Sequence, residues 1–181
     1  MTDEYIIIQR TQKWITEVVV GCNFCPFAAK EVMNDTIDYQ VETATDLERS
    51  LQAFLDACRR LDQNERISTG FVIFPDAFAE FGDYLDVVSL AEQLLTQEEY
   101  EGIYQVASFH PLYRFADAPP DDPANFTNRS PYPMLQLLRE ESVEQALLRY
   151  ADPASIPERN ILFARNKGLA FMKMLRDACM L

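Results

Sequence analysis

The chain of 181 residues has one histidine and five glycines, and both scarcities limit the chemistry it can carry. The glycines are dispersed and form neither a dinucleotide fingerprint nor a phosphate-cradling loop, so nothing supports a nucleotide cofactor. One histidine and a single Cys-x-x-C pair make a four-ligand structural zinc site hard to assemble. The identity of any cofactor stays open.

Long apolar runs and a positive net charge are also lacking. The apolar run at residues 6–8 is far too short for an export signal or a membrane span, and acidic residues precede it where a signal peptide carries basic ones. A formal net charge of -13 repels nucleic acids and anionic membranes. We therefore expect a cytoplasmic, acidic protein with thiols instead of disulfides and with neither nucleic acid nor membrane as a partner. The oligomeric state stays open.

Local patterning predicts an α/β fold in a single domain over residues 1–181. Short apolar or alternating runs at 37–41, 71–74 and 103–109 are typical of strands, and helical patterns separate them. A helical crossover between consecutive strands of one sheet makes them parallel. We expect a small, largely parallel sheet of three strands, or of four, packed with helices.

Apolar spacing and capping residues predict the helices. A helix over residues 4–20 should end at Gly21, and a loop over 22–30 should follow. Thr45 and Glu48 form a capping box in front of the next helix, and a further helix covers roughly 84–96. The last third is predicted to be helical, in three segments over 133–140, 142–151 and 155–181.

A long polar loop spans residues 108–133. It opens with the only histidine, His110, and closes with the sequence Thr127-Asn128-Arg129-Ser130-Pro131-Tyr132-Pro133. An ordered loop of this length inside a compact domain is uncommon and usually binds or catalyses. The sequence therefore predicts the working site in this loop.

A nucleophile and a base can be assigned to this site. Asp76 and His110 each follow a predicted strand, so both should lie at the carboxyl edge of the sheet, where ligands bind. A carboxylate beside His110 would fix its tautomer and raise its basicity. Cys25 would then be a nucleophile activated by His110 and oriented by Asp76 or Asn128. In the opposing interpretation His110 makes ordinary hydrogen bonds at a strand end, and Cys25 is a small buried hydrophobe.

Arg129 and the predicted helix start at Pro133 indicate anion binding. The free amides of a first helical turn beside a guanidinium bind phosphate or carboxylate. Alternatively, Arg129 pairs with Asp121 or Asp122 and fastens the loop. The residues expected to bind a small polar or anionic ligand are Asn23, Asn125, Arg129, Ser130, Tyr132, Arg139 and Arg159.

Two further patterns, one of cysteines and one of acidic residues, indicate alternative kinds of site. The pair Cys22 and Cys25 follows a helix instead of lying between a strand and a helix, so it lacks the context of a thioredoxin motif. Asp117, Asp121 and Asp122 could join His110 around a divalent metal, although acidic loops are more often simply solvated.

Several segments together resemble the domain-of-unknown-function family 1415. They are residues 21–27, 74–76, 107–111, 125–133 with 137–140, and 156–160. The resemblance spans nearly the whole chain, and because the family has no established activity it implies no reaction. In the family pattern an apolar residue is usual at Cys22, which leaves Cys25 as the matching cysteine. A histidine is common where this chain has Gln136, so the resemblance argues against a metal site shared by two histidines.

Three functions follow as hypotheses. The first is an enzyme acting on a small anionic or polar metabolite, with Cys25 as nucleophile, His110 as base and Arg129 holding the substrate. The second is a non-catalytic module in which the loop recognises a small anion or a protein. The third is a metal-dependent hydrolase centred on His110 and Asp122.

Overall fold

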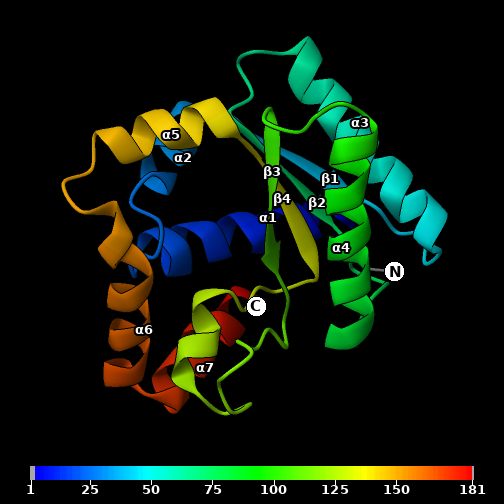
Figure 1. The fold of residues 1–181 in the computed structure, drawn as a ribbon. Helices are drawn as coiled ribbons and strands as arrows, with labels where there is room; N and C mark the ends of the chain where they lie inside the picture. Colours follow the sequence, from blue (N-terminus) through cyan, green and yellow to red (C-terminus); the bar gives the residue numbers. More distant parts are fainter. Residues whose placement is uncertain (1–2, 181) are drawn as a thin grey trace.

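The computed structural model describes residues 3–180, which fold around a four-stranded mixed sheet (Figure 1). The strands are β1 (Ile37–Val41), β2 (Thr69–Ile73), β3 (Tyr104–Phe109) and β4 (Met134–Arg139). Their order is β1-β2-β4-β3, with β1 parallel to β2 and β4 antiparallel to both of its neighbours. The first three strands therefore run in one direction, and β4 separates β2 from β3.

The structure differs from the predicted topology at strand β4. Residues 133–140 are not the expected helix, because residues 134–139 form a central strand whose backbone pairs with β2 and β3. Pairing on both sides satisfies the backbone and buries Leu135 and Leu137 completely, which outweighs the weak local preference for helix. The α/β class is confirmed, and the sheet has four strands, one of the two numbers expected, but it is mixed instead of largely parallel.

Helices cover both faces of the sheet (Figure 1). One apolar cluster packs α3 (Leu47–Gln63) and α4 (Phe81–Gln97) against sheet residues such as Val72 and Leu135. The other cluster uses the alternate residues Phe71, Ile73 and Met134, as the period of two in a strand requires. Figure 1 shows the remaining helices on this second side: α1 (Glu4–Trp14), α2 (Ala28–Asn34), α5 (Glu140–Leu148), α6 (Ile156–Lys167) and α7 (Leu169–Asp177).

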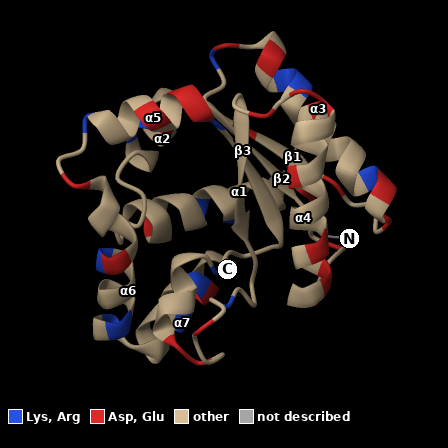
Figure 2. Ribbon diagram, in the orientation of Figure 1, with Lys and Arg blue, Asp and Glu red and all other residues tan. Residues whose placement is uncertain are grey.

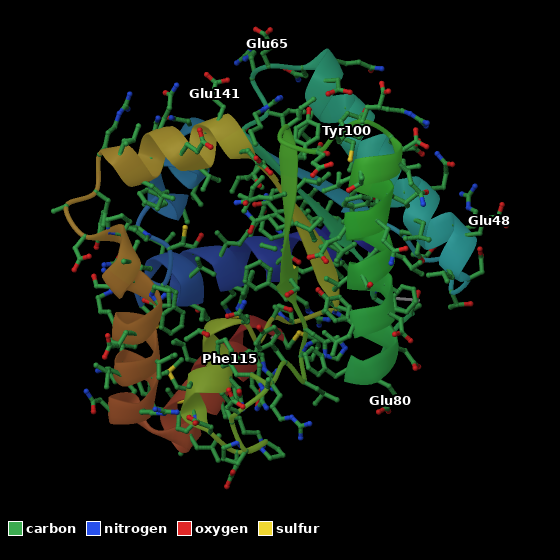
Figure 3. The ribbon with its side chains drawn as sticks, in the orientation of Figure 1. Glu48, Glu65, Glu80, Tyr100, Phe115 and Glu141 are labelled. Carbon is green, nitrogen blue, oxygen red and sulfur yellow. The ribbon has the colours of Figure 1, made fainter. Side chains whose placement is uncertain are left out.

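The short 3₁₀ segments complete the chain at Pro123–Thr127, Pro153–Ser155 and Ala178–Met180. Figure 2 shows acidic residues along α3 and α4 and at the start of α5. Glu48, Glu65, Glu80 and Glu141 project outward from these parts of the molecule (Figure 3). Within residues 3–180, no helix combines the length and the apolar character that crossing a bilayer requires.

Several helix boundaries differ from the predicted ones for local reasons. Asp46, not Thr45, caps α3, because its carboxylate accepts the Arg49 N–H at 2.9 Å. The helix predicted over 155–181 is split at Gly168, whose φ of 85° suits glycine because it has no Cβ. The last residue of that prediction, Leu181, lies outside the described residues.

The predicted N-terminal helix ends at Gly21 but changes its winding before that point. After α1 the chain forms a π-helix at Ile15–Val20, which is a rare conformation often found at functional sites. A Cβ atom on Gly21 would lie 2.2 Å from the carbonyl oxygen of Glu17. Glycine is therefore required where the wide turn closes. The predicted loop over 22–30 is shorter than expected, because α2 starts at Ala28.

Candidate functional site

His110 is fully buried at the end of β3, and both nitrogens of its ring are occupied. The Leu112 N–H donates to Nδ1 at 2.9 Å, so Nε2 carries the proton and donates it to the Phe78 carbonyl at 2.8 Å. Burial lowers the pKa of the imidazole, which keeps it neutral. The ring packs against Phe81 and Tyr84 of α4. In this arrangement His110 has no free lone pair with which to act as a base.

Three further polar side chains of the loop, those of Asn125, Asn128 and Ser130, bond to the backbone of the loop. Asn125 accepts the Phe115 N–H at 3.0 Å and donates to the Pro119 carbonyl at 2.9 Å. Asn128 donates to the Ser108 carbonyl at 3.2 Å. Ser130 Oγ donates to the Tyr132 carbonyl, the Tyr132 hydroxyl accepts from Arg10 Nη1 at 3.1 Å, and these bonds hold the loop in one shape.

Arg129 also fastens the loop, although not through a carboxylate. Its Nε and Nη2 donate to the carbonyls of Tyr113 and Pro120 at 2.9 and 2.7 Å. The guanidinium lies 4.7 Å from the centre of the Phe126 ring. Asp122 instead pairs with Arg165 at 2.7 Å, and that hydrogen bond lowers the pKa of the carboxyl.

The structure does not bring Cys25, His110 and Asp76 together. Cys25 packs against the cluster on the α1 face, whereas His110 contacts α4 on the opposite face. Asp76 is exposed, and the group bonded to His110 Nε2 is the Phe78 carbonyl. Among residues 3–180 there is no group of three or more His, Cys, Asp or Glu side chains that could hold a metal ion.

The loop also borders a shallow cleft of about 680 Å³ beside the start of α4. Exposed side chains, among them Glu80, Leu85 and Arg114, form much of its wall. The guanidinium of Arg129, which also lines it, already bonds to two carbonyls. This cleft therefore offers few polar groups oriented toward a ligand.

Arg139 and Arg159, two of the expected ligand-binding residues, hold the backbone in place. Arg139 Nη2 donates to the Leu61 carbonyl at 2.6 Å and Nε to the Ile67 carbonyl at 3.0 Å, which secures the end of α3 to β4. Arg159 donates to the Tyr150 hydroxyl and to the Asn23 carbonyl, both at 2.7 Å.

The turn over residues 21–27 is held by this second arginine and its neighbour. Asn23 has a left-handed backbone with a φ of 54°, and its carbonyl accepts from Arg159. The next carbonyl, that of Phe24, accepts from Asn160 Nδ2 at 2.6 Å. Two segments far apart in the sequence are thereby joined, and Cys25 is positioned over the sheet.

An apolar cavity of about 340 Å³ lies under this turn. It is enclosed by the π-helix, α2, α5 and one face of the sheet. Cys25 and Gln136 both line it, so Gln136 and not His110 shares a cavity with Cys25. The apolar lining includes Trp14, Ile15, Val19, Phe27, Ala28, Ile37, Phe71, Ala107, Phe109, Leu138, Val143 and Ala146.

Gln136 presents an oriented acceptor in the cavity wall. The Thr69 hydroxyl donates its only hydrogen to the Leu137 carbonyl at 2.6 Å, so it accepts from Gln136 Nε2 at 3.0 Å. This contact fixes which end of the Gln136 amide is the nitrogen. Among residues 3–180, no donor bonds to the remaining carbonyl oxygen, Oε1.

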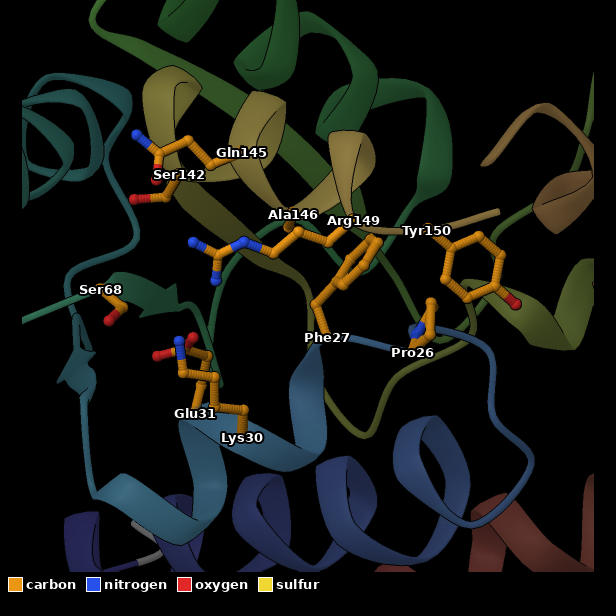
Figure 4. Close-up of a pocket in the computed structure, with 10 residues that line it drawn as sticks. All are labelled: Pro26, Phe27, Lys30, Glu31, Ser68, Ser142, Gln145, Ala146, Arg149 and Tyr150. Carbon is orange, nitrogen blue, oxygen red and sulfur yellow. The ribbon is translucent and has the colours of Figure 1, made fainter. Parts of the chain in front are cut away.

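A polar recess of about 310 Å³ adjoins the cavity (Figure 4). Phe27, Glu31, Ser68, Ser142 and Ala146 line both spaces, so the recess forms the mouth of the cavity. The other residues around the recess are Pro26, Lys30, Gln145, Arg149 and Tyr150.

The comparison with known families identifies the chain. A family model described as "Protein of unknown function (DUF1415)" matches residues 6–174. The chain belongs to this family. No curated protein and no solved structure is significantly similar to the chain. The resemblance inferred from the sequence motifs is thus confirmed.

Three of the segments on which the DUF1415 resemblance rests contribute to the cavity. Residues 21–27 supply Cys25 and Phe27, residues 107–111 supply Ala107 and Phe109, and residues 137–140 supply Leu138. The sequence interpretation missed Lys30, Thr69 and Arg149, which are ordinary residue types on separate elements. A signal existed only for Gln136, because the family resemblance marks its position as one where histidine is common.

Proposed function

We propose that this member of the DUF1415 family is a cytoplasmic small-molecule binding protein whose ligand inserts its apolar part into the cavity under residues 21–27. The observation that supports this proposal is that an apolar cavity is continuous with a polar mouth. Ligand sites in proteins commonly combine apolar walls with a few oriented polar groups, as here with Gln136. Covering apolar walls contributes about 25 cal/mol for each Å² removed from water.

The cavity favours binding over cysteine catalysis. Burial raises the pKa of the Cys25 thiol, so the thiol is protonated and weakly nucleophilic at neutral pH. The carboxylate of Glu31 raises the pKa further, and no histidine or cationic lysine is among the residues that line the cavity. The second hypothesis, a non-catalytic module, therefore gains support, with the ligand site moved from the polar loop to this cavity.

The walls of the cavity are preorganised, which supports the same proposal. Gly21 closes the π-helix, and Arg159 with Asn160 fixes the carbonyls of the following turn. A site held in its binding shape loses less conformational entropy when a ligand enters.

Trp14 makes the proposal directly testable. It is the only tryptophan, it is fully buried, and it lines the cavity. A brominated ligand in the cavity should therefore quench the fluorescence of the protein. We expect 8-bromo-1-octanol to quench Trp14 saturably, and intact mass measurements to show that no thiol is alkylated.

Two matched variants separate filling of the cavity from unspecific effects. Ala146→Phe places a ring where the cavity meets its mouth and should abolish saturable quenching. Ala170→Phe adds the same ring at an exposed position on α7 and should leave quenching intact. Equal quenching in all three proteins, or none in the wild type, would contradict the proposal.

A further inference from the structure

We infer that the ligand is an amphipathic monoanion, an apolar carboxylate whose head group is held between Lys30 and Arg149 while its chain enters the cavity. This inference rests on the proposed function, because it assigns the chemistry of the ligand that the cavity binds. The evidence for the carboxylate is the set of charged side chains around the mouth.

Lys30 and Arg149 approach the mouth from different elements. Lys30 belongs to α2, and Arg149 directly follows α5. Figure 4 shows the Arg149 guanidinium extended into the recess, toward the side that Ser68 and Glu31 line. Both cations thus line the recess that shares residues with the cavity.

Neither cation has a carboxylate partner among residues 3–180. The ion pairs of the described chain join Arg59, Arg60, Arg165 and Arg176 to acidic residues elsewhere. Acid is abundant, since the net charge is -13, yet the mouth keeps two cations available. Charge-assisted hydrogen bonds from lysine and arginine are the strong contacts that carboxylates make in proteins.

The net charge of the mouth favours a ligand head group with a single negative charge. Glu31 lines the recess and the cavity, and its carboxylate accepts the Thr36 hydroxyl. Lys30, Arg149 and Glu31 together leave one net positive charge. That balance complements a carboxylate and disfavours a doubly charged phosphate monoester or a cation. The hydroxyls of Ser68 and Ser142 add donors at the same place.

The cavity fixes the direction of the ligand. Arg139 lines the cavity, but its Nε and Nη2 already donate to the carbonyls of Ile67 and Leu61. A charged head group in the apolar depth would therefore lose hydration without compensation, whereas at the exposed mouth it stays hydrated. The chain must then point inward, among apolar lining residues such as Trp14 and Ile15. A hydroxyl or amide on that chain would find an acceptor in Gln136 Oε1.

Three probes with one chain and three head groups test the inference. They are 8-bromooctanoate, 8-bromo-1-octanol and 8-bromooctylamine, each titrated against Trp14 fluorescence at neutral pH. We expect the carboxylate to bind at least about tenfold more tightly than the alcohol, and the amine most weakly.

Variants at the mouth should remove this preference without closing the cavity. Arg149→Gln and Lys30→Gln should each reduce the advantage of the carboxylate by roughly fivefold or more, and leave the affinity for the alcohol unchanged. Arg66→Gln removes an exposed arginine outside the recess and should change neither. Circular dichroism of each variant verifies that it is folded.

The outcomes distinguish the inference from the proposed function. If all three probes quench Trp14 with equal affinity, the cavity binds apolar chains and the assignment of a carboxylate is overturned. If the amine binds most tightly, Glu31 governs the mouth and the assignment is likewise overturned. If none of the probes quenches, the proposed function itself fails.

Discussion

Arg159 donates to the Tyr150 hydroxyl and to the Asn23 carbonyl, both at 2.7 Å, so one guanidinium joins the end of α5 to the turn after the π-helix. Tyr150 in turn contacts Phe27 edge to face, with ring centres 5.9 Å apart. Both walls of the recess are therefore held by one side chain that does not itself line the recess.

Replacing Arg159 should loosen the mouth. Arg159→Ala removes two charge-assisted hydrogen bonds and should lower the free energy of unfolding by about 1–2 kcal/mol, since part of the side chain is solvated. It should also weaken quenching of Trp14 by the brominated probes. Urea denaturation and fluorescence titration measure the two effects, with Arg66→Ala as the exposed control. Unchanged affinity would mean that the mouth keeps its shape without Arg159.

Gly21 should tolerate no side chain. Gly21→Ala puts a Cβ atom 2.2 Å from the Glu17 carbonyl oxygen and should cost about 2 kcal/mol or more, because backbone must move. Gly82→Ala is the matched control, since a Cβ there meets nothing within 4 Å in the first turn of α4. The control should be neutral or slightly stabilising. Chemical denaturation compares the two, and equal stabilities would refute the requirement for glycine.

His110 should make the protein less stable as the pH falls. Burial holds its folded-state pKa below the value of 6.5 that it has when unfolded, so the unfolded chain takes up the proton first. The contribution of neutral His110 is complete above about pH 6.5 and is lost progressively below it. Urea denaturation between pH 7.5 and 5.5, at about half-unit steps, should show this slope in the wild type and a smaller one in His110→Gln. Identical slopes would argue against a buried neutral imidazole.

Cys25 should react slowly with alkylating agents. Because burial raises its pKa, the pH at which alkylation becomes half-maximal should lie above the free-thiol value of about 8.5. Cys58, whose pKa burial raises to about 12, should react more slowly still. Peptide mass spectrometry resolves the two sites. A Cys25 pKa below 8.5 that rises in His110→Ala would instead restore the catalytic pair.

Local patterns in the sequence predicted much of the fold. The strands β1, β2 and β3, the helix ending at Gly21 and the DUF1415 membership follow from apolar periods, a stop signal and motifs, and each is confirmed. The strand β4 could not be predicted this way, since Leu135, Leu137 and Leu138 are equally compatible with a helix. Its neighbours in the sheet, far away in sequence, decide its conformation.

The candidate site was harder to predict than the fold. The polar residue types of the loop over 108–133 predicted a ligand site there. A loop without regular secondary structure, however, needs such side chains to satisfy its own backbone N–H and C=O groups. Asn125 and Arg129 do so here. Lys30 and Arg149, in contrast, meet at one recess only because α5 packs over the turn that precedes α2. No spacing in the sequence predicts that these two residues line the same recess.

The central position of β4 also determines when the sheet can close during synthesis. Until residues 134–139 have left the ribosome, β2 and β3 each present an unpaired inner edge, and β3 has no strand beside it. While the last third is synthesised, these two edges can pair with strands of other chains, which leads to aggregation. A truncation that ends at residue 133 should therefore aggregate instead of folding, because the missing strand is the one that joins the two halves of the sheet.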